Sequence, residues 1–360
     1  MSHNEIPITM KIYTLFAIFA LALLGCAPAE PEGATLLIGT YTDAGSRGIY
    51  RTTFSEGGFS APELVVEVDN PSFLALSDDG RTLYTVSEGG TDETSALSAY
   101  RYDAKADSFT LINRQPTNGA SPCYVRLFGG SAFTANYTGG SFTSFSIAED
   151  GSLGEPVERE FEPREGSRSH VHGLFEAPDG ESLYVTDLGR NEIFQIDASG
   201  RELSRTQLRM GVGPRHMAFA KDGKVAYALN ELSGTVSVFD IEPQGLSLKQ
   251  EIASDSVGGG GCADIHLTRD GRFLYASNRL KEDGISVFSV GEDGRLTKVG
   301  YTLTGVHPRN FTLTADDRFL LVALRDSNRV EVYARDAKTG LLTPTAMSLE
   351  LSHPVCLVWM

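Results

Sequence analysis

Histidine and arginine recur along this sequence at positions from which they could act together on one small molecule. Six histidines follow residue 26: His170, His172, His216, His266, His307 and His353. Arginines stand nearby at positions 168, 215, 279, 309 and 325. Histidine can take a proton from water near neutral pH, and arginine offers a planar fork of donors suited to a carboxylate, a phosphate or a developing oxyanion. The two together predict acid–base chemistry on an anionic compound.

Each of these side chains also has a structural interpretation. Histidines at strand ends can cap backbone groups, and arginines can pair with the many acidic residues. His170 and His172 are separated by two, which places them on the same face of a strand. Such a pair can bind a metal, but no carboxylate lies beside it in the sequence, so we predict neither a metal nor a cofactor. The sequence lacks a Gly-x-Ser-x-Gly elbow and a His-Glu-x-x-His helix, which leaves serine-hydrolase and zincin mechanisms without support.

An internal repeat indicates the elements that must position these residues. Each copy has a short polar or Pro-containing segment, an apolar run, an Asp-Gly or similar turn, and a second apolar run. The copies begin near Pro71, Pro122, His170, Pro214, Ala263, Pro308 and Pro354, about 45–50 residues apart. That spacing is typical of a four-stranded propeller blade, and Asp-Gly suits the hairpin between antiparallel strands. We therefore predict an all-β, seven-bladed β-propeller.

The last copy of the repeat indicates how the ring closes. It contains one strand only, Val355 to Trp359, whereas Thr35 to Tyr41 resembles the second strand of the other copies. The two ends of the chain are therefore predicted to share one blade, because closure removes the exposed edges of the sheets. A single domain over residues 35–360 follows.

Blade geometry also predicts that the reactive residues share one opening of the ring. The first two strands of a blade are antiparallel, so the start of the first and the end of the second lie at the same end of the sheet. The histidines stand at or near the starts of first strands. The second strands end at Tyr41, Glu88, Tyr137, Leu188, Glu231, Arg279 and Arg325. We therefore expect one mouth lined with imidazole, guanidinium and carboxylate groups.

The composition excludes some classes of partner and of structure for this chain. The net charge of −16 argues against sequence-independent binding to nucleic acid, which needs a basic surface. The hydrophobic content of 41% and the charged content of 22% are typical of a globular domain. Cys123, Cys262 and Cys356 have strand-like neighbours, so we predict small buried hydrophobes rather than a disulfide framework. The sequence leaves the oligomeric state open.

The first residues are typical of a targeting signal. Lys11 precedes an apolar run from Ile12 to Leu24, too short for a comfortable membrane span. The run leads into Leu23-Leu24-Gly25-Cys26, which resembles the lipobox of a bacterial lipoprotein. We predict a signal peptide over 1–26 with lipidation at Cys26, a linker over 27–34, and export to the cell envelope with the lipid anchor as the membrane contact. An ordinary signal peptide or a short anchor helix is the alternative.

Several longer motifs resemble those of a known family. They are Ser169-His170-Val171-His172, Gly213-Pro214-Arg215-His216 with Asn230-Glu231, Ser277-Asn278-Arg279, His307-Pro308-Arg309-Asn310-Phe311 and Asn136-Tyr137-Thr138-Gly139-Gly140. In this order they resemble the lactonase family typified by propeller-type 6-phosphogluconolactonase, over nearly all of the chain that follows the signal. The resemblance implies a seven-bladed propeller that hydrolyses a sugar-derived lactone without a required cofactor.

The same family contains a fungal carboxymuconate cyclase, whose proposed site has a histidine, two arginines and a glutamate. By motif these correspond to His172 (or His170), Arg215, Arg279 and Glu231. The resemblance implies that the histidine activates water, that the arginines hold an anionic group or the oxyanion, and that Glu231 orients an arginine or donates a proton.

The substrate and the reaction remain open at the level of the sequence. The predicted substrate contacts are Tyr137, His216, His266, His307, Arg309 and Arg325. A phosphorylated sugar lactone forms in the cytoplasm, which disagrees with an export signal, so we predict an anionic lactone substrate without specifying phosphate. A muconate-type cyclase and a non-catalytic surface-binding propeller are the alternatives.

Overall fold

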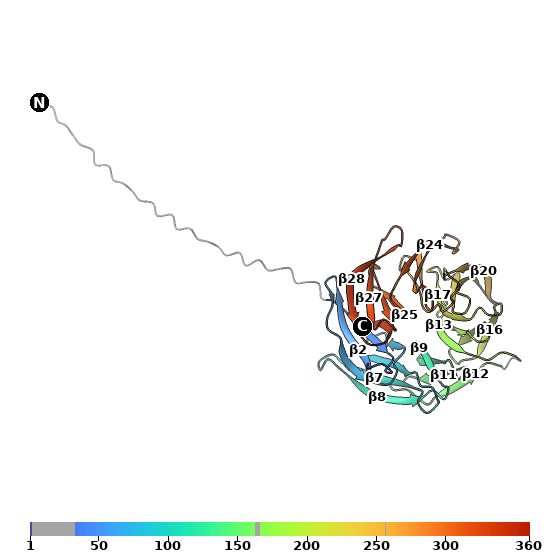
Figure 1. Ribbon diagram of the computed structural model, residues 1–360. Coiled ribbons are helices and arrows are strands. Elements are labelled where there is room, and N and C mark those ends of the chain that lie inside the picture. Colours follow the sequence, from blue (N-terminus) through green and yellow to red (C-terminus); the bar gives the residue numbers. More distant parts are fainter. Residues whose placement is uncertain (2–32, 163–165, 256) are drawn as a thin grey trace. The chain divides into compact units, whose positions relative to one another are not determined.

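The computed structural model describes residues 1, 33–162, 166–255 and 257–360, so Cys26 and the apolar run before it lie outside the described residues. The described residues form seven antiparallel sheets arranged as blades around a central axis (Figure 1). They contain strands and turns but no α-helix. None of these residues belongs to a helix long and apolar enough to cross a bilayer. The predicted all-β, seven-bladed propeller is confirmed.

Six blades each contain four consecutive strands, with the first strand nearest the axis. Two of them are β5 (Leu74–Leu76), β6 (Thr82–Ser87), β7 (Ala96–Asp103), β8 (Ser108–Pro116) and β9 (Pro122–Phe128), β10 (Ser131–Asn136), β11 (Ser141–Ser146), β12 (Val157–Glu160). Two more are β13 (Val171–Glu176), β14 (Ser182–Asp187), β15 (Glu192–Asp197), β16 (Glu202–Gln207) and β17 (Pro214–Phe219), β18 (Val225–Asn230), β19 (Thr235–Glu242), β20 (Gly245–Ala253). The last two are β21 (Ile265–Leu267), β22 (Phe273–Asn278), β23 (Gly284–Val290), β24 (Leu296–Leu303) and β25 (Pro308–Leu313), β26 (Phe319–Leu324), β27 (Arg329–Arg335), β28 (Leu342–Glu350).

The remaining blade joins the two ends of the chain. β29 (Pro354–Trp359) pairs antiparallel with β1 (Ala34–Thr40), which pairs with β2 (Gly48–Ser55). The short strands β3 (Gly58–Phe59) and β4 (Glu63–Glu67) both pair with β2. The predicted sharing of one blade by the N- and C-terminal strands is therefore confirmed. In Figure 1 the blue β2 lies beside the red β28 of the preceding blade.

Hairpins and tyrosines hold the blades in a regular arrangement. The predicted Asp-Gly turns close the inner hairpins, with φ near +70° at Gly80, Gly180, Gly223 and Gly271, a conformation that glycine adopts without strain. Buried tyrosines of three second strands donate hydrogen bonds to carbonyls of the next blade, in the pairs Tyr84–Gly151, Tyr227–Gly294 and Tyr275–Gly340. These contacts fix the angle between neighbouring blades.

A second repeated hydrogen bond aligns the residues at the mouth. The residue that follows the second strand donates its N–H to the carbonyl of the residue before the first strand or, in the blade of β5, to that of Asn70, four residues before Leu74. This bond is present for the pairs Tyr41–His353, Glu88–Asn70, Tyr137–Ser121, Leu188–His170, Glu231–Gly213 and Arg325–His307. The two sets of positions that the sequence aligned are therefore brought together at one end of the ring.

Five of the seven first strands carry a β-bulge at their second residue, which is Cys123 in β9, Val355 in β29 and a predicted site residue in β13, β17 and β25. The strand register shifts by one residue between β13 and β14, between β17 and β18, and between β25 and β26. In these three strands, the residues left without a partner in the register are His172, Arg215 and Arg309. A bulge bends the strand and redirects a side chain, so three predicted site residues owe their orientation to a local break in regular pairing.

Candidate functional site

A carboxylate clamped by two arginines lies at the mouth of the ring. One oxygen of Glu231 lies 2.9 Å from Nε of Arg215, and the other lies 3.2 Å from Nη2 of Arg279. The arginine side chains are 3% and 6% exposed, whereas the glutamate side chain is 23% exposed. Burial alone would raise the pKa of Glu231, but Arg279 and Arg215 hold that pKa below its ordinary value. Glu231 is therefore a carboxylate at neutral pH.

The backbone of one loop fixes both guanidinium groups. Arg279 Nε donates to the carbonyl of Gly261 at 2.7 Å, and its Nη2 donates to that of Cys262 at 3.4 Å. Arg215 Nη1 donates to the carbonyl of the next residue, Ala263. Three consecutive carbonyls thus accept from two arginines that come from different blades, which holds the clamp on Glu231 rigidly.

A buried histidine adjoins this clamp. His172 is 4% exposed, its ring lies edge-on to Tyr137 at 5.6 Å, and it contacts the ring of His216 at 5.4 Å. Burial lowers the pKa of His172 well below 6.5, and Arg215 lowers it further. Its Nδ1 lies 3.9 Å from Sγ of Cys123, and within the described part of the chain its Nε2 makes no hydrogen bond. His172 is therefore a neutral imidazole with one nitrogen free to act on a ligand.

A third arginine faces the same space. Arg309 Nη2 lies 3.6 Å from Glu88, and the guanidinium stacks on the ring of Tyr41 at 5.1 Å. The hydroxyl of Tyr41 donates to Glu88 at 2.9 Å. The Arg309 side chain is 13% exposed, and no hydrogen bond joins it to any of the described residues. Its donors are therefore available to a ligand.

Two further histidines, His216 and His307, each contact one of the clamping arginines. Nη1 of Arg215 donates to Nε2 of His216 at 3.2 Å, and Nδ1 of His216 lies 2.9 Å from Asp264. His307 has the same relation to Arg279, again at 3.2 Å, and its Nδ1 lies 3.2 Å from Asp326. Both were predicted as substrate contacts, and in the structure each lies between an arginine and an aspartate.

The other predicted residues stand farther from Glu231. His170 Nδ1 bonds the carbonyl of Tyr137 at 2.9 Å, and its ring stacks on Tyr137 at 4.6 Å. Arg325 is tied to the neighbouring Asp326. His266, whose side chain is 43% exposed, has its Nε2 3.0 Å from Asp264 and lines a cavity toward the end of the ring where the inner hairpins turn. The structure thus brings His172, Arg215, Glu231 and Arg279 together, with Tyr137 and Arg309 beside them, and leaves His266 outside this group.

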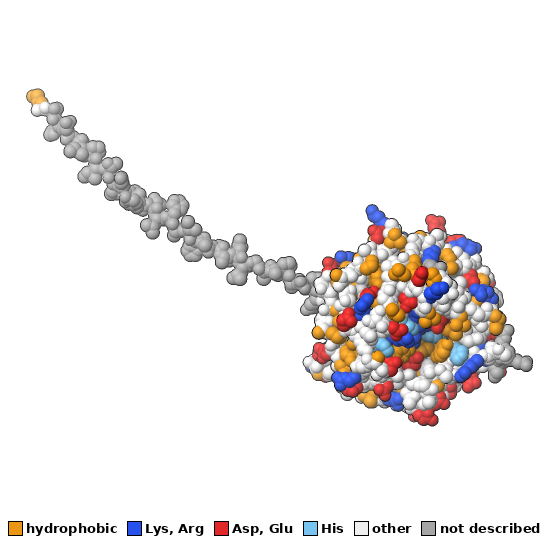
Figure 2. All heavy atoms as spheres, in the orientation of Figure 1, with side chains coloured by type: hydrophobic (Ala, Val, Ile, Leu, Met, Phe, Trp, Pro, Cys, Tyr) orange, Lys and Arg blue, Asp and Glu red, His pale blue; other side chains and the backbone are white. Residues whose placement is uncertain are grey.

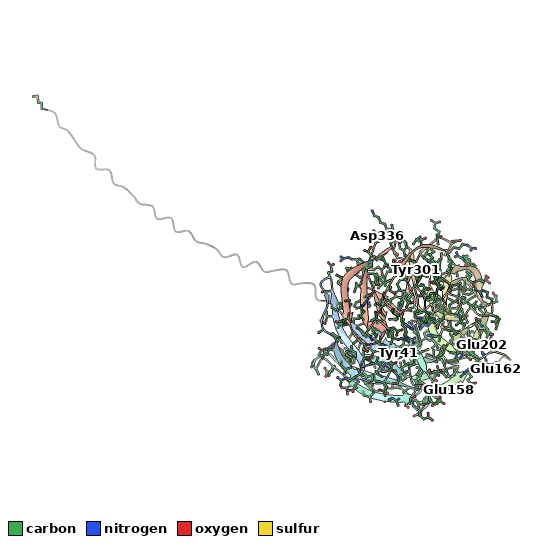
Figure 3. All side chains as sticks on the ribbon, viewed as in Figure 1. Tyr41, Glu158, Glu162, Glu202, Tyr301 and Asp336 are labelled. Atoms are coloured by element: carbon green, nitrogen blue, oxygen red, sulfur yellow. The ribbon has the colours of Figure 1, made fainter. Side chains whose placement is uncertain are left out.

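Figure 2 shows the result on one face of the molecule, where Lys and Arg, His, and Asp and Glu side chains gather in a hollow at the centre. Tyr41 lies toward the centre of the ring in Figure 3, whereas Glu158, Glu202 and Asp336 lie toward its edge. Charge is therefore distributed in two ways: scattered around the rim and concentrated at the axis.

Some residues of this cluster were not predicted as part of the site. They are Tyr41, Glu88, Asp264, Asn310 and Asp326. Tyr41 and Glu88 occupy the position that ends a second strand, as Glu231 does, so the repeat alignment contained a signal for both. Asp264 is fully enclosed and bonds His216, His266, Asn310 and the N–H of Phe311. It precedes His266 by two, but no sequence pattern marked it.

The three cysteines of the propeller are buried among the inner strands. Cys123, Cys262 and Cys356 are free and buried, as predicted. Among the residues that the structure describes, no group of three or more His, Cys, Asp or Glu side chains is arranged to hold a metal ion. The lipidation predicted at Cys26 lies outside the described residues.

Comparison with known proteins identifies the family. Residues 35–359 match the family described as "Lactonase, 7-bladed beta-propeller". The chain belongs to this family. The 6-phosphogluconolactonase of Bacillus subtilis is 30% identical over 338 residues, which cover 89% of this chain and 96% of that relative. The match supports the predicted class of lactone-hydrolysing enzymes.

Solved structures of the lactonase family superpose closely on this chain. A periplasmic gluconolactonase from Pseudomonas aeruginosa has a TM-score of 0.85 and 32% identity, covering 91% of this chain and 99% of its own. A protein from Bacteroides fragilis, provisionally named a 6-phosphogluconolactonase, has a TM-score of 0.86 and 40% identity, covering 92% and 99%. The predicted resemblance to the lactonase family is therefore confirmed.

Proposed function

We propose that this chain hydrolyses a sugar-derived lactone that carries an anionic group. The observation that supports this proposal is that three guanidinium groups face two carboxylates, Glu231 and Glu88, at the mouth of a chain whose net charge is −16. Arg215 and Arg279 share the single carboxylate of Glu231, and Arg309 adds a third guanidinium. Burial lowers the pKa of Arg279 to about 10, and the neighbouring Arg215 contributes to this shift. A negative charge on the substrate or on the developing oxyanion would reduce the electrostatic repulsion between these guanidinium groups.

The proposed reaction begins with attack of water on the carbonyl carbon of the lactone. His172, as a neutral imidazole, accepts the proton of that water. The carbonyl oxygen becomes an oxyanion, which Arg215 and Arg279 stabilise because their positions are fixed in advance by backbone carbonyls. When the oxyanion collapses, the ring C–O bond breaks, and the imidazolium returns the proton to the leaving alkoxide. The product is the open hydroxy acid.

Glu231 acts in this proposal as a fixed carboxylate. Its lowered pKa means that it carries no proton at neutral pH, which favours the orienting role over the role of proton donor. Arg309 and Tyr137 are proposed to contact the remainder of the substrate, since both line the mouth without being part of the clamp. Arg309 would bind the anionic group of the substrate through its free donors.

A lactone panel assayed with the purified mature chain tests the proposal. We expect hydrolysis of gluconolactone or its phosphorylated form above the rate in buffer. Arg215→Ala should lower kcat/KM by about 10²–10³, the usual cost of removing an oxyanion donor. No rate above background for any lactone, with a folded protein, would disprove the proposal. Product analysis with a muconate-type substrate would separate hydrolysis from cyclisation.

We also propose that the chain acts outside the cytoplasm, anchored by lipid at Cys26. The sequence around Cys26 supports this, and the P. aeruginosa neighbour is a periplasmic enzyme by name. Cells that express the full chain should incorporate radiolabelled palmitate into it, and Cys26→Ser should abolish labelling. Labelling that persists in Cys26→Ser, or an unlabelled wild-type chain, would contradict the anchor.

A further inference from the structure

The two arginines that clamp Glu231 are each supported by the same arrangement of side chains. Behind Arg215 lies His216, whose Nδ1 is 2.9 Å from Asp264. Behind Arg279 lies His307, whose Nδ1 is 3.2 Å from Asp326. In both cases the histidine Nε2 is 3.2 Å from arginine Nη1. Two Asp–His–Arg series thus converge on one carboxylate from different blades.

The chemistry of the partners decides the proton on each histidine. A guanidinium has only donors, so the nitrogen facing it must offer a lone pair. The Nε2 atoms of His216 and His307 are therefore unprotonated, and each ring carries its hydrogen on Nδ1. That N–H points at the carboxylate of Asp264 or Asp326. An imidazolium would instead turn a donor toward each arginine and repel it.

We propose that His216 and His307 are positioning residues, each held by an aspartate in the Nδ1–H tautomer. The Nε2 atom of each ring then accepts a hydrogen bond from an arginine and holds that arginine against Glu231. The proposal rests on the function proposed above for the arginines. It gives both histidines a role that does not require contact with substrate. Burial lowers the pKa of His216 to about 4 and that of His307 to about 3, and the neighbouring arginines contribute, so both rings are neutral at pH 7.

The two series differ in how firmly their aspartates are fixed. Asp264 is 3% exposed and also accepts from Asn310 and from the N–H groups of Ile265 and Phe311. The side chain of Asp326 is 36% exposed and is shared with Arg325. The first series therefore belongs to the interior of the ring, whereas the second can be altered from the surface. This makes His307 and Asp326 the better positions for mutation.

The tautomers can be measured directly in the wild-type chain. We expect ¹⁵N NMR of histidine-labelled protein at pH 7 to show a protonated Nδ1 and an unprotonated Nε2 for both His216 and His307. His216→Gln and His307→Gln identify the two signals. An Nε2–H tautomer or an imidazolium at either ring would overturn the proposal. The measurement does not depend on turnover.

Variants at His307 test the consequence for catalysis. His307→Ala removes the acceptor, so we expect kcat on the best lactone to fall at least tenfold. The amide oxygen of His307→Gln can accept from Arg279 Nη1, and this variant should keep at least a third of wild-type kcat. His353→Ala is the matched control, because His353 pairs with Asp43 at 2.7 Å but adjoins neither clamping arginine; it should keep wild-type kcat.

The outcomes separate this inference from the proposed function. If the wild type hydrolyses no lactone, the proposed function fails, and the NMR result alone decides the tautomers. If hydrolysis is found but His307→Gln loses as much kcat as His307→Ala with the fold intact, His307 does not act through an accepted hydrogen bond and the inference fails. A loss of kcat in His353→Ala equal to that in His307→Ala would likewise overturn the inference, because the loss would then not depend on contact with a clamping arginine.

Discussion

The two openings of the ring are built from the same seven inner strands but differ in chemistry. At the mouth, the first residues of these strands supply His172, Arg215 and Arg309. Toward the opposite opening, the later residues enclose a cavity of about 410 Å³ lined largely by rings, among them Phe73 and Tyr124, whose centroids are 4.0 Å apart. The same cavity is lined by the Arg126–Glu176 pair, whose side chains are 39% and 41% exposed, and by Asp264 with His266, of which the Asp264 side chain is 5% exposed. The buried guanidinium groups of Arg215 and Arg279 thus lie at the mouth, whereas the buried charge that lines the opposite cavity is the carboxylate of Asp264.

The difference shows how one repeated strand can serve two purposes. Regular alternation along β9, β13 and β17 packs rings and methyl groups between blades near the hairpins. In β13 and β17 a bulge at the second residue interrupts that alternation at the mouth and redirects the side chains of His172 and Arg215, whereas the bulged residue of β9 is the buried Cys123. Stability and chemistry are thereby assigned to different ends of the same strand.

Glu231→Ala should have the largest effect on the mouth, lowering both stability and activity. It leaves two buried guanidinium groups without a carboxylate, so we expect a loss of about 3–5 kcal/mol of unfolding free energy. Since both arginines would also lose their orientation, kcat/KM should fall by about 10³. Urea denaturation and lactone assays measure the two effects. Glu231→Gln keeps the side-chain volume and serves as the control. If Glu231→Ala unfolds with wild-type free energy, the carboxylate does not stabilise the two buried guanidinium groups.

Arg309→Ala should affect binding more than turnover. Its guanidinium has free donors at the mouth, so removing it should raise KM for an anionic lactone about tenfold, the value of one charge-assisted hydrogen bond. KM for a neutral lactone should change less than twofold. Steady-state kinetics on a matched pair, such as gluconolactone with and without phosphate, makes the measurement. Equal changes for the two substrates would remove Arg309 from recognition of the anion.

The two openings should also differ in how pH acts on stability. His216 and His307, which contact the two clamping arginines, have folded pKa values of about 4 and about 3, below the unfolded value near 6.5. Their contribution is present above pH 6.5 and is lost as the pH falls toward 4 and 3, because the unfolded chain then binds more protons. His266 has the opposite sign: burial alone would lower its pKa, but Asp264 raises it. Its contribution is present below pH 6.5 and is lost as the pH rises through the folded pKa.

Urea denaturation at pH 5 and pH 8 tests these signs with matched variants. Relative to wild type, His266→Gln should destabilise more at pH 5 than at pH 8, and His307→Gln should destabilise more at pH 8 than at pH 5. The same sign for both variants would mean that the two openings do not differ electrostatically.

Arg126→Ala should give the smallest effect. Its pair with Glu176 is short, at 2.5 Å, but exposed, and such pairs contribute about 0–1 kcal/mol. We expect a change in unfolding free energy below about 1 kcal/mol and unchanged kcat/KM. A large loss of activity would show that the opposite opening takes part in catalysis.

Much of the fold could be read from the sequence because a blade is a local structure. Asp-Gly turns, apolar runs and their spacing depend on residues within one repeat, so the number of blades and the closing pair β1–β29 could be predicted. The convergence of Arg215, Glu231 and Arg279 was implied by family motifs and by the alignment of strand ends. The positions of His266 and Asp264 could not be predicted, because they depend on how deep each side chain lies along the axis.

By itself, the sequence determined the repeat, the ring and the end of the ring at which polar residues collect, since hairpin geometry carries these through short-range contacts. The tertiary structure decided which polar residues meet. His216 and Asp264 are 48 residues apart, and Arg279 and His307 are 28 apart, so each contact forms only when neighbouring blades pack at a fixed angle. The bulges at His172, Arg215 and Arg309 then set the direction of the side chains. Those two conditions turn a scatter of histidines and arginines into a clamp on one carboxylate.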